Sequence, residues 1–187
     1  KTDLNHSHIP VILLTAKNTQ QSRLEGLELG ADAYIEKPFS VNILLAQITN
    51  LINNRHSVRK YYINSPIANL KSIAHTKADE IFLEKLNEII LENISNSDLD
   101  VDMLAEQMNM SRPTLYRKIK AVSDLTPNDL IRTCRLKKAA KYIEEGELSL
   151  NEIAENVGFN SQSYFSRSFS KQFGSTPSDY LNNIKNK

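Results

Sequence analysis

The first fifty residues combine short apolar runs with helical spacing, a pattern typical of an α/β unit. Residues 9–14 form a continuous apolar run, which predicts a strand buried on both faces. Residues 22–29 have helical spacing that stops at Gly30, and residues 33–35 predict a second strand. Ser40 is placed to cap a helix with a broad apolar stripe, formed by Val41, Leu44, Leu45, Ile48, Leu51 and Ile52. The order strand, helix, strand, helix favours parallel strands.

The pattern changes twice further along the chain. Residues 54–78 have no sustained periodicity and no acidic residue, so they are interpreted as a linker. From Asp79 onward the spacing is helical throughout, beginning with an apolar stripe at Ile81, Leu83, Leu86, Ile89, Ile90 and Ile94. The predicted organisation is an α/β part at 1–53, a linker at 54–78 and an all-α domain at 79–187.

The all-α domain contains one pattern twice, about fifty residues apart. Residues 104–119 and residues 153–169 both follow the order apolar-Ala-Glu, apolar anchor, short turn, Ser, apolar residue and Arg. Each copy predicts a short helix, a tight turn and a second helix, in units of about 101–122 and 150–173. A Thr-Pro pair follows each unit, at Thr126 and Thr176, and this is a sound helix start.

A helix at about 127–145 is predicted to join the two units. Its roughly 18 residues span about 27 Å at 1.5 Å per residue. That length could hold two recognition helices near the roughly 34 Å that separates successive major-groove faces of B-DNA. The spacing therefore favours double-stranded DNA as the partner.

Bulk composition excludes several classes and hides a segregated charge. Among the 187 residues, no apolar run approaches the roughly 20 residues that cross a bilayer, so no membrane contact is expected. One cysteine excludes an internal disulfide and suits a reducing cytoplasm. The net charge is only +1, but residues 111–122 and 132–141 carry basic residues and no acid. Such segregation indicates one basic face.

The second copy carries the most specific motif, Gly158-Phe159-x-Ser161-x-Ser163-Tyr164-Phe165-x-Arg167-x-Phe169, continued by Lys171-x-Phe173-Gly174-x-Thr176-Pro177-x-x-Tyr180. In these residues the chain resembles the AraC/XylS family of bacterial transcription activators over about residues 80–184. The resemblance implies seven helices, with recognition helices at about 111–122 and 161–173.

The positions that match the family's base-contacting sites lie at the start of each recognition helix. They are Arg112, Pro113, Tyr116 and Arg117 in the first helix, and Gln162, Ser163, Ser166 and Arg167 in the second. Arginine suits guanine and glutamine suits adenine. Pro113 departs from the family pattern and is expected to fix the first helical turn. The expected phosphate contacts are Lys118, Lys120, Lys137, Lys138 and Lys171. Tyr164, Phe165, Phe169 and Phe173 are expected in the core.

Residues 9–39 resemble the C-terminal half of a response-regulator receiver domain. The resemblance is carried by the segments IPVILLTA, GLxxGADAY and KPF. It implies strand 4, helix 4, strand 5 and helix 5 of a doubly wound parallel sheet, with a cis Lys37-Pro38 bond. It also implies switch roles for Thr15, Tyr34 and Lys37, and a homodimer formed through this part.

The acidic residues that a receiver uses lie on its first and third strands, which this sequence lacks; Asp3 is not expected to replace them. Hence no phosphoryl chemistry and no cofactor are expected in this chain, and Mg²⁺ only in an intact receiver. A receiver joined to an AraC-type domain resembles the end of a hybrid two-component regulator, common in Bacteroidetes, whose kinase region would lie elsewhere. RNA polymerase is a candidate partner.

Two other classes of function stay open. An enzyme could use Cys134, but no His or acid is arranged to activate it, and inert packing is favoured. His6, His8, His56 and His75 have no metal-ligand spacing, so no metal site is expected. The helical repeats could instead form a protein interaction module without direct DNA contact. Replacing Arg117 and Arg167 with alanine distinguishes that module from a DNA-binding domain.

Overall fold

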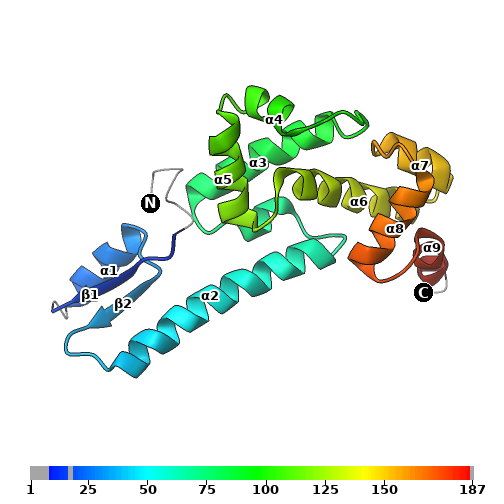
Figure 1. Cartoon of the computed structure of the whole chain (residues 1–187). Coiled ribbons are helices and arrows are strands. Elements are labelled where there is room, and N and C mark those ends of the chain that lie inside the picture. The colour runs from blue at the N-terminus through cyan, green and yellow to red at the C-terminus, as the bar shows by residue number, and fades with distance from the viewer. Residues whose placement is uncertain (1–8, 17–18, 186–187) are drawn as a thin grey trace.

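The N-terminal part is a small parallel βαβ unit. The computed structural model describes residues 9–16 and 19–185 (Figure 1). β1 (Ile12–Thr15) and β2 (Ala33–Glu36) pair in parallel, with α1 (Gln20–Glu28) between them in sequence. The Thr19 side chain caps α1, and the Asp32 carboxylate accepts a 2.7 Å bond from the Val11 amide before the strands begin. The peptide bond between Lys37 and Pro38 is cis.

A single long helix leaves this unit, and it corrects the predicted domain boundary. α2 (Val41–Asn64) begins at its Ser40 cap and continues for 24 residues, past position 53. Its Arg55 is buried and forms a 2.8 Å ion pair with Asp32. The interpretation of 54–64 as a linker was wrong, because these residues continue the helix. The helical periodicity was hidden because a charged residue, Arg55, occupies the inward-facing stripe. Its partner is 23 residues away, so local periodicity could not show that the position is buried.

The segment after α2 belongs to the helical core as well. Tyr62 near the end of α2 is buried, and so are Leu70 and Ile73 of the 3-10 helix η1 (Leu70–Ile73). These side chains join the cluster that includes Leu83 and Leu86. Residues 62–73 therefore fasten α2 to the domain that follows and do not form a free connection.

Seven α-helices follow within the described residues from 77 to 185, in agreement with the predicted number. They are α3 (Lys77–Glu92), α4 (Val101–Gln107), α5 (Arg112–Ser123), α6 (Pro127–Glu145), α7 (Leu150–Asn156), α8 (Gln162–Phe173) and α9 (Pro177–Lys185). α6 has the predicted bounds, from the Thr126 cap to the left-handed Gly146. Its Leu130 belongs to the core around α3, α4 and α5, while its Leu136 belongs to the core around α7 and α8. α6 thus joins two similar halves.

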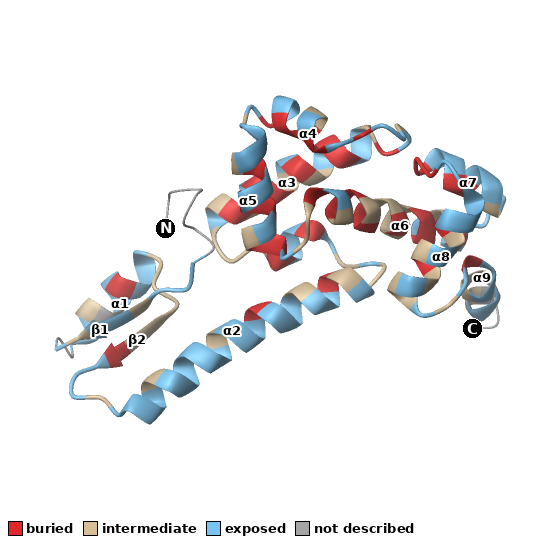
Figure 2. Ribbon diagram, in the orientation of Figure 1, coloured by how far each residue is buried: buried red, intermediate tan, exposed pale blue. Residues whose placement is uncertain are grey.

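The two parts of the molecule differ sharply in burial (Figure 2). Among the described residues up to position 53, only Gly26 and Ile35 are buried. The exposed apolar side chains of this part include Leu13, Leu24, Leu29, Val41, Ile43, Leu45 and Ile52. A surface of this kind indicates a contact face. No helix in the described part of the chain combines the length and apolar character that crossing a bilayer requires.

Candidate DNA interface

The two helix-turn-helix units repeat one another at the level of single hydrogen bonds. In the first turn, the amides of Met108 and Met110 donate to the carbonyls of Leu104 and Ala105, both at 2.9 Å. In the second, the amides of Val157 and Phe159 donate to the carbonyls of Ile153 and Ala154, at 3.1 and 2.9 Å. Each pair is offset by 49 residues (153 − 104). The sequence repeat is therefore a repeat of structure.

The offset becomes 50 residues within the second turn (161 − 111), because Asn160 has no counterpart in the first. Ser111 and Ser161 are the N-caps of α5 and α8, and their hydroxyls accept the amides of Thr114 and Tyr164, both at 3.4 Å. The two N-cap serines are thus equivalent, although the second turn is one residue longer. Both recognition helices begin with the same local chemistry.

Each turn requires one left-handed residue at the same place. Asn109 has φ of 52° and Gly158 has φ of 76°. Asparagine tolerates this conformation and glycine adopts it without strain. The sequence repeat hides this equivalence, because the two residues differ.

The predicted base-contacting arginines have the same conformation in both helices. Arg117 Nε donates to the Pro113 carbonyl and Arg167 Nε donates to the Ser163 carbonyl, both at 3.3 Å. Both side chains are exposed. This back-bonding uses the Nε donor, and the terminal nitrogens of an exposed guanidinium can form a bidentate contact.

The other predicted base-contacting residues lie on the same exposed stripes. In α5, Tyr116 is exposed, and Arg112 forms an exposed 3.0 Å ion pair with Asp102 of α4. In α8, Gln162 and Ser163 are exposed and Ser166 is half-buried. Pro113 lies in the first turn of α5, as predicted from its fixed φ.

One predicted phosphate contact is wrong. The Lys118 side chain is 2% exposed and forms a 2.5 Å ion pair with Asp79, which is completely buried at the start of α3. Its ammonium also lies 5.5 Å from the Phe82 ring centre. Lys118 therefore fastens α5 to α3. This pairing could not be predicted from local spacing, because the partner is 39 residues away.

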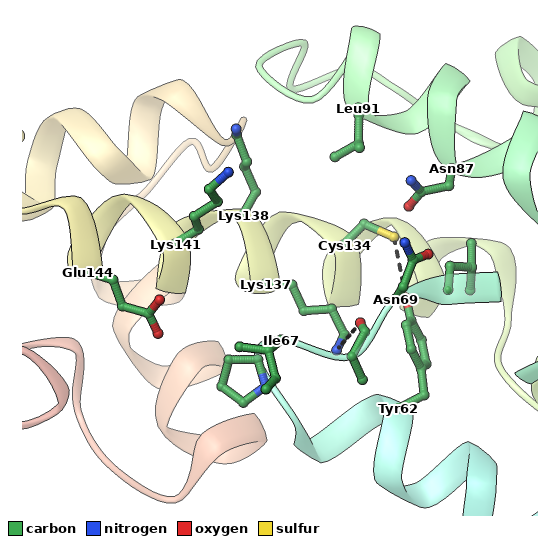
Figure 3. Close-up of a pocket in the computed structure, with 13 residues that line it drawn as sticks. Tyr62, Ile67, Asn69, Asn87, Leu91, Cys134, Lys137, Lys138, Lys141 and Glu144 are labelled. Carbon is green, nitrogen blue, oxygen red and sulfur yellow. Dashed lines mark hydrogen bonds between the residues drawn. The ribbon is translucent and has the colours of Figure 1, made fainter. Parts of the chain in front are cut away.

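Lys137 also points into the protein (Figure 3). Its ammonium donates to the carbonyls of Ser65 and Ala68 and lies 4.3 Å from the Tyr62 ring centre. Burial lowers the pKa of Lys137 to about 8. The predicted phosphate contact of Lys137 is therefore wrong, because Lys137 holds the end of α2 against α6.

The three remaining lysines differ in their surroundings. Lys138 lies over the Tyr142 ring at 4.6 Å and lines the same pocket as Lys137, a hollow of about 490 Å³. Lys120 donates to the carbonyl of Asp124 and pairs with its carboxylate at 3.1 Å. Lys171 is exposed on α8, one turn beyond Arg167. Lys120 and Lys171 thus keep the positions that a phosphate contact needs, and the Lys138 contact stays a prediction.

The aromatic residues of α8 divide into core and surface. Phe165 and Phe169 are completely buried, as predicted, and their rings meet edge to face with 5.8 Å between centroids. Phe173 packs against that core at its border. Tyr164 is 52% exposed, with one edge against Phe159, so its prediction as a core residue was wrong. It lies one turn before Arg167 on the exposed stripe.

A cleft beside α8 adds a residue that was not among the predicted contacts. Arg132 of α6 lines this cleft of about 590 Å³ together with Arg167 and Lys171. It is partly neutralised by Asp129, whose pKa is lowered by the Thr126 hydroxyl and by Arg132 itself. The acid-free run 132–141 was the available signal, but only the fold shows which of its cations faces α8.

The predicted switch residues of the α/β part lie together. The Lys37 amide donates to the Thr15 carbonyl at 2.8 Å, where both strands end. Tyr34 lies on β2 with its ring beside Gly26 of α1. The switch roles of these residues stay a prediction. His6, His8 and Asp3 lie outside the described residues.

Cys134 is a packing residue of α6. It is buried, and its sulfur lies 3.6 Å from the Tyr62 hydroxyl. Burial raises the pKa of the thiol to about 11, which suppresses the thiolate that a nucleophile requires. The interpretation as inert packing agrees with this environment.

Comparison with known proteins identifies the helical part. The family model "Helix-turn-helix domain" matches residues 104–183. The C-terminal domain of AraT, a response regulator from Geobacillus stearothermophilus, has a TM-score of 0.50 and 35% identity over 54% of this chain and 83% of that one. The DNA-binding domain of AdpA in complex with a target DNA has a TM-score of 0.51 and 27% identity, over 55% of this chain and 92% of that one.

Two relatives identified by sequence are longer proteins. Histidine kinase P4 of Formosa agariphila is 40% identical over 182 residues, which are 97% of this chain and 13% of the relative. The Msm operon regulatory protein of Streptococcus mutans is 31% identical over 65% of this chain and 42% of its own length. The chain thus spans less than half of each of these relatives.

Proposed function

Since this chain is a DNA-binding transcription regulator whose helical domain is of the AraC/XylS helix-turn-helix type, we propose that α5 and α8 enter successive stretches of one major-groove face. The proposed base contacts are Arg112, Tyr116 and Arg117 from α5, and Gln162, Ser163, Ser166 and Arg167 from α8. Lys120 and Lys171 contact phosphates and set the affinity without selecting sequence.

The observation that carries this proposal is the equivalence of Arg117 and Arg167. Both are exposed, both lie six residues after the serine cap of their helix, and both donate from Nε to the carbonyl four residues earlier at 3.3 Å. A solvated basic face does not require such repetition. α6 joins the two units, so two arginines with the same backbone bond can make two equivalent base contacts.

Selection of bound duplexes from random DNA tests the proposal. We expect two short motifs about one helical turn apart. The variant Arg117→Ala/Arg167→Ala should lose this enrichment while its circular dichroism and melting temperature stay unchanged. A matched control, Lys85→Ala/Lys141→Ala, removes two exposed charges outside the recognition helices and should keep the enrichment. Unchanged enrichment in the arginine variant would support the interaction-module alternative.

The α/β part is proposed to be the C-terminal half of a receiver, so that the parent is a hybrid two-component regulator. The 40% identity to a histidine kinase over nearly this whole chain supports that origin. In this scheme an aspartate outside this sequence is phosphorylated, and Thr15 and Lys37 respond to it. In the intact parent, Thr15→Ala/Lys37→Ala should abolish signal-dependent promoter activity; constitutive activity would count against the scheme.

α2 is proposed to carry the change to the DNA-binding part. It runs without interruption from the Asp32–Arg55 ion pair to Tyr62, which is buried against Cys134. A helix held by Arg55 on one side and Tyr62 on the other moves as one body, so a rearrangement at the receiver half would shift the recognition helices. A dimer formed through that half would place two DNA-binding domains on one promoter, and RNA polymerase is the proposed further partner there.

A further inference from the structure

α2 has the composition of a nucleic-acid contact over its second half. The sequence has no acidic residue between Glu36 and Asp79. Within that interval, α2 carries Arg55, His56, Arg59 and Lys60 on consecutive turns. A run of basic residues without any acid is the electrostatic mark of a phosphate-binding surface.

Two of these cations hold α2 in place and are not free to bind a ligand. Arg55 is paired with Asp32 at 2.8 Å. Arg59 donates to the carbonyls of Val122 and Ala121, at 2.8 and 2.6 Å, where α5 ends. α2 is therefore fastened to the carboxyl end of the first recognition helix, and His56 and Lys60 belong to a fixed surface.

Three other polar residues form an exposed stripe on the second half of α2. His56, Lys60 and Asn64 are spaced four residues apart and are all exposed. They line a hollow of about 390 Å³ against the loop between α5 and α6. No hydrogen bond or ion pair is assigned to the Lys60 ammonium within residues 9–16 and 19–185.

The stripe continues into the cleft beside the second recognition helix. Asn64 lines the cleft of about 590 Å³ opposite Arg167 and Lys171 of α8. Figure 1 shows α2 passing below α5 and α6 and ending near α8, and α2 and α8 are in contact. One surface thus extends from Lys60 across the cleft to the exposed side of α8.

This surface lies beside the helix that is proposed to enter the major groove. When a helix enters a major groove, which is about 12 Å wide, a sugar-phosphate strand passes on each side of it. On one side of α8 lies the cleft whose outer wall is the end of α2. The acids on the path are already paired, Asp124 with Lys120 and Asp129 with Arg132.

We propose that the stripe His56, Lys60 and Asn64 of α2 is a third DNA-contacting element, which binds the phosphates of the strand that flanks α8. Lys60 provides the charge, and His56 and Asn64 provide hydrogen bonds. The inference rests on the proposed function, and it assigns a DNA contact to a helix outside the helix-turn-helix domain. Its effect is on affinity and salt dependence and does not depend on base sequence.

The test is the salt dependence of binding by the full chain to a duplex obtained in the selection above, measured by fluorescence anisotropy. Lys60→Gln should reduce the slope of log K against log salt by about 0.9, the value for one lost phosphate contact. It should weaken binding to the selected duplex and to an unrelated duplex by the same factor. Lys85→Gln, the same change on α3 at a position lining neither hollow, should leave the slope unaltered.

The outcomes separate this inference from the function on which it rests. If the unaltered chain binds the duplex and Lys60→Gln keeps the full slope, the α2 contact is refuted and the function stands. Tighter binding by Lys60→Gln would also refute it, because α2 would then shield α8 from DNA. If the unaltered chain shows no salt-dependent duplex binding, both proposals fail together.

Discussion

At Gly158 the backbone of the second turn has φ of 76°, and its surroundings leave no room for a side chain. A Cβ there would lie 2.5 Å from the Ile94 carbonyl oxygen and 2.9 Å from a guanidinium nitrogen of Arg135. We expect Gly158→Ala to destabilise the chain by at least about 3 kcal/mol, since left-handed strain of about 1 to 2 kcal/mol is added to a backbone clash. Urea unfolding measures this loss.

Gly146 supplies the matched control for that substitution. It also has a left-handed φ, 71°, but nothing lies within 4 Å of an added Cβ. Gly146→Ala should therefore cost only about 1 kcal/mol, the strain alone. Equal losses for the two variants would show that the contact with Ile94 relaxes freely.

The Lys118–Asp79 pair is the other single contact on which the fold depends. Lys118→Met removes the ammonium that faces the Asp79 carboxylate and leaves that carboxylate buried, which costs about 3 to 5 kcal/mol. The double variant Lys118→Met/Asp79→Asn should recover much of that loss, because no unpaired charge remains. Chemical denaturation of both variants tests the pair, and a single variant as stable as the unaltered chain would contradict it.

Residue roles could be predicted where a local motif determined them. Arg117 and Arg167 could be selected because each is fixed by its distance from a serine cap; both are exposed, and their base contacts stay predictions. Lys118 and Tyr164 were predicted wrongly in opposite directions. Helical spacing alone cannot tell that a lysine is paired inside the core or that an aromatic residue lies at its edge.

At the scale of elements, helix ends were predictable and the course of α2 was not. α6 has the predicted bounds because Thr126, Pro127 and Gly146 mark its ends within the segment itself. α2 passes through the predicted boundary at 53 because its inward-facing stripe includes Arg55. A polar residue in a buried stripe becomes interpretable only when its distant partner, Asp32, is known.

The junction between α2 and α3 should give the chain a defined pH dependence. Burial, followed by Arg55 and Arg59, lowers the pKa of His75 from 6.5 to about 4. Between these values the unfolded chain binds a proton that the folded chain does not, so the stability from this site is complete above pH 6.5 and falls as pH decreases toward 4. His75→Gln should flatten the melting temperature against pH in that window.

His56 is the control for this measurement, because it is exposed on α2. The same change, His56→Gln, should leave the pH profile of the melting temperature as it is in the unaltered chain. Carboxylates titrate in the same range and contribute equally to both variants. A His75→Gln profile identical to that of His56→Gln would mean that His75 is protonated in the folded state.

At the scale of the whole molecule, two bodies of unequal burial are joined by one helix. The helical domain has a continuous core through α6, whereas the βαβ unit leaves most of its apolar side chains exposed (Figure 2). The sequence predicted both bodies from their periodicity. It could not predict their arrangement, because the contacts that fix α2, through Arg59, Tyr62 and Lys137, all join positions more than 60 residues apart.

The exposed stripe on the first half of α2 should form a contact between two copies of the chain. Val41, Leu45 and Ile52 are 65%, 54% and 56% exposed, and with Ile48 they follow helical spacing. We expect a concentration-dependent dimer at micromolar concentration, measured by sedimentation or light scattering. Leu45→Ser/Ile52→Ser should shift it to monomer, whereas Ile81→Ser, which removes an apolar side chain 58% exposed on α3, should not. A strict monomer across that range would contradict the proposal that dimerisation through α2 couples the receiver half to DNA binding.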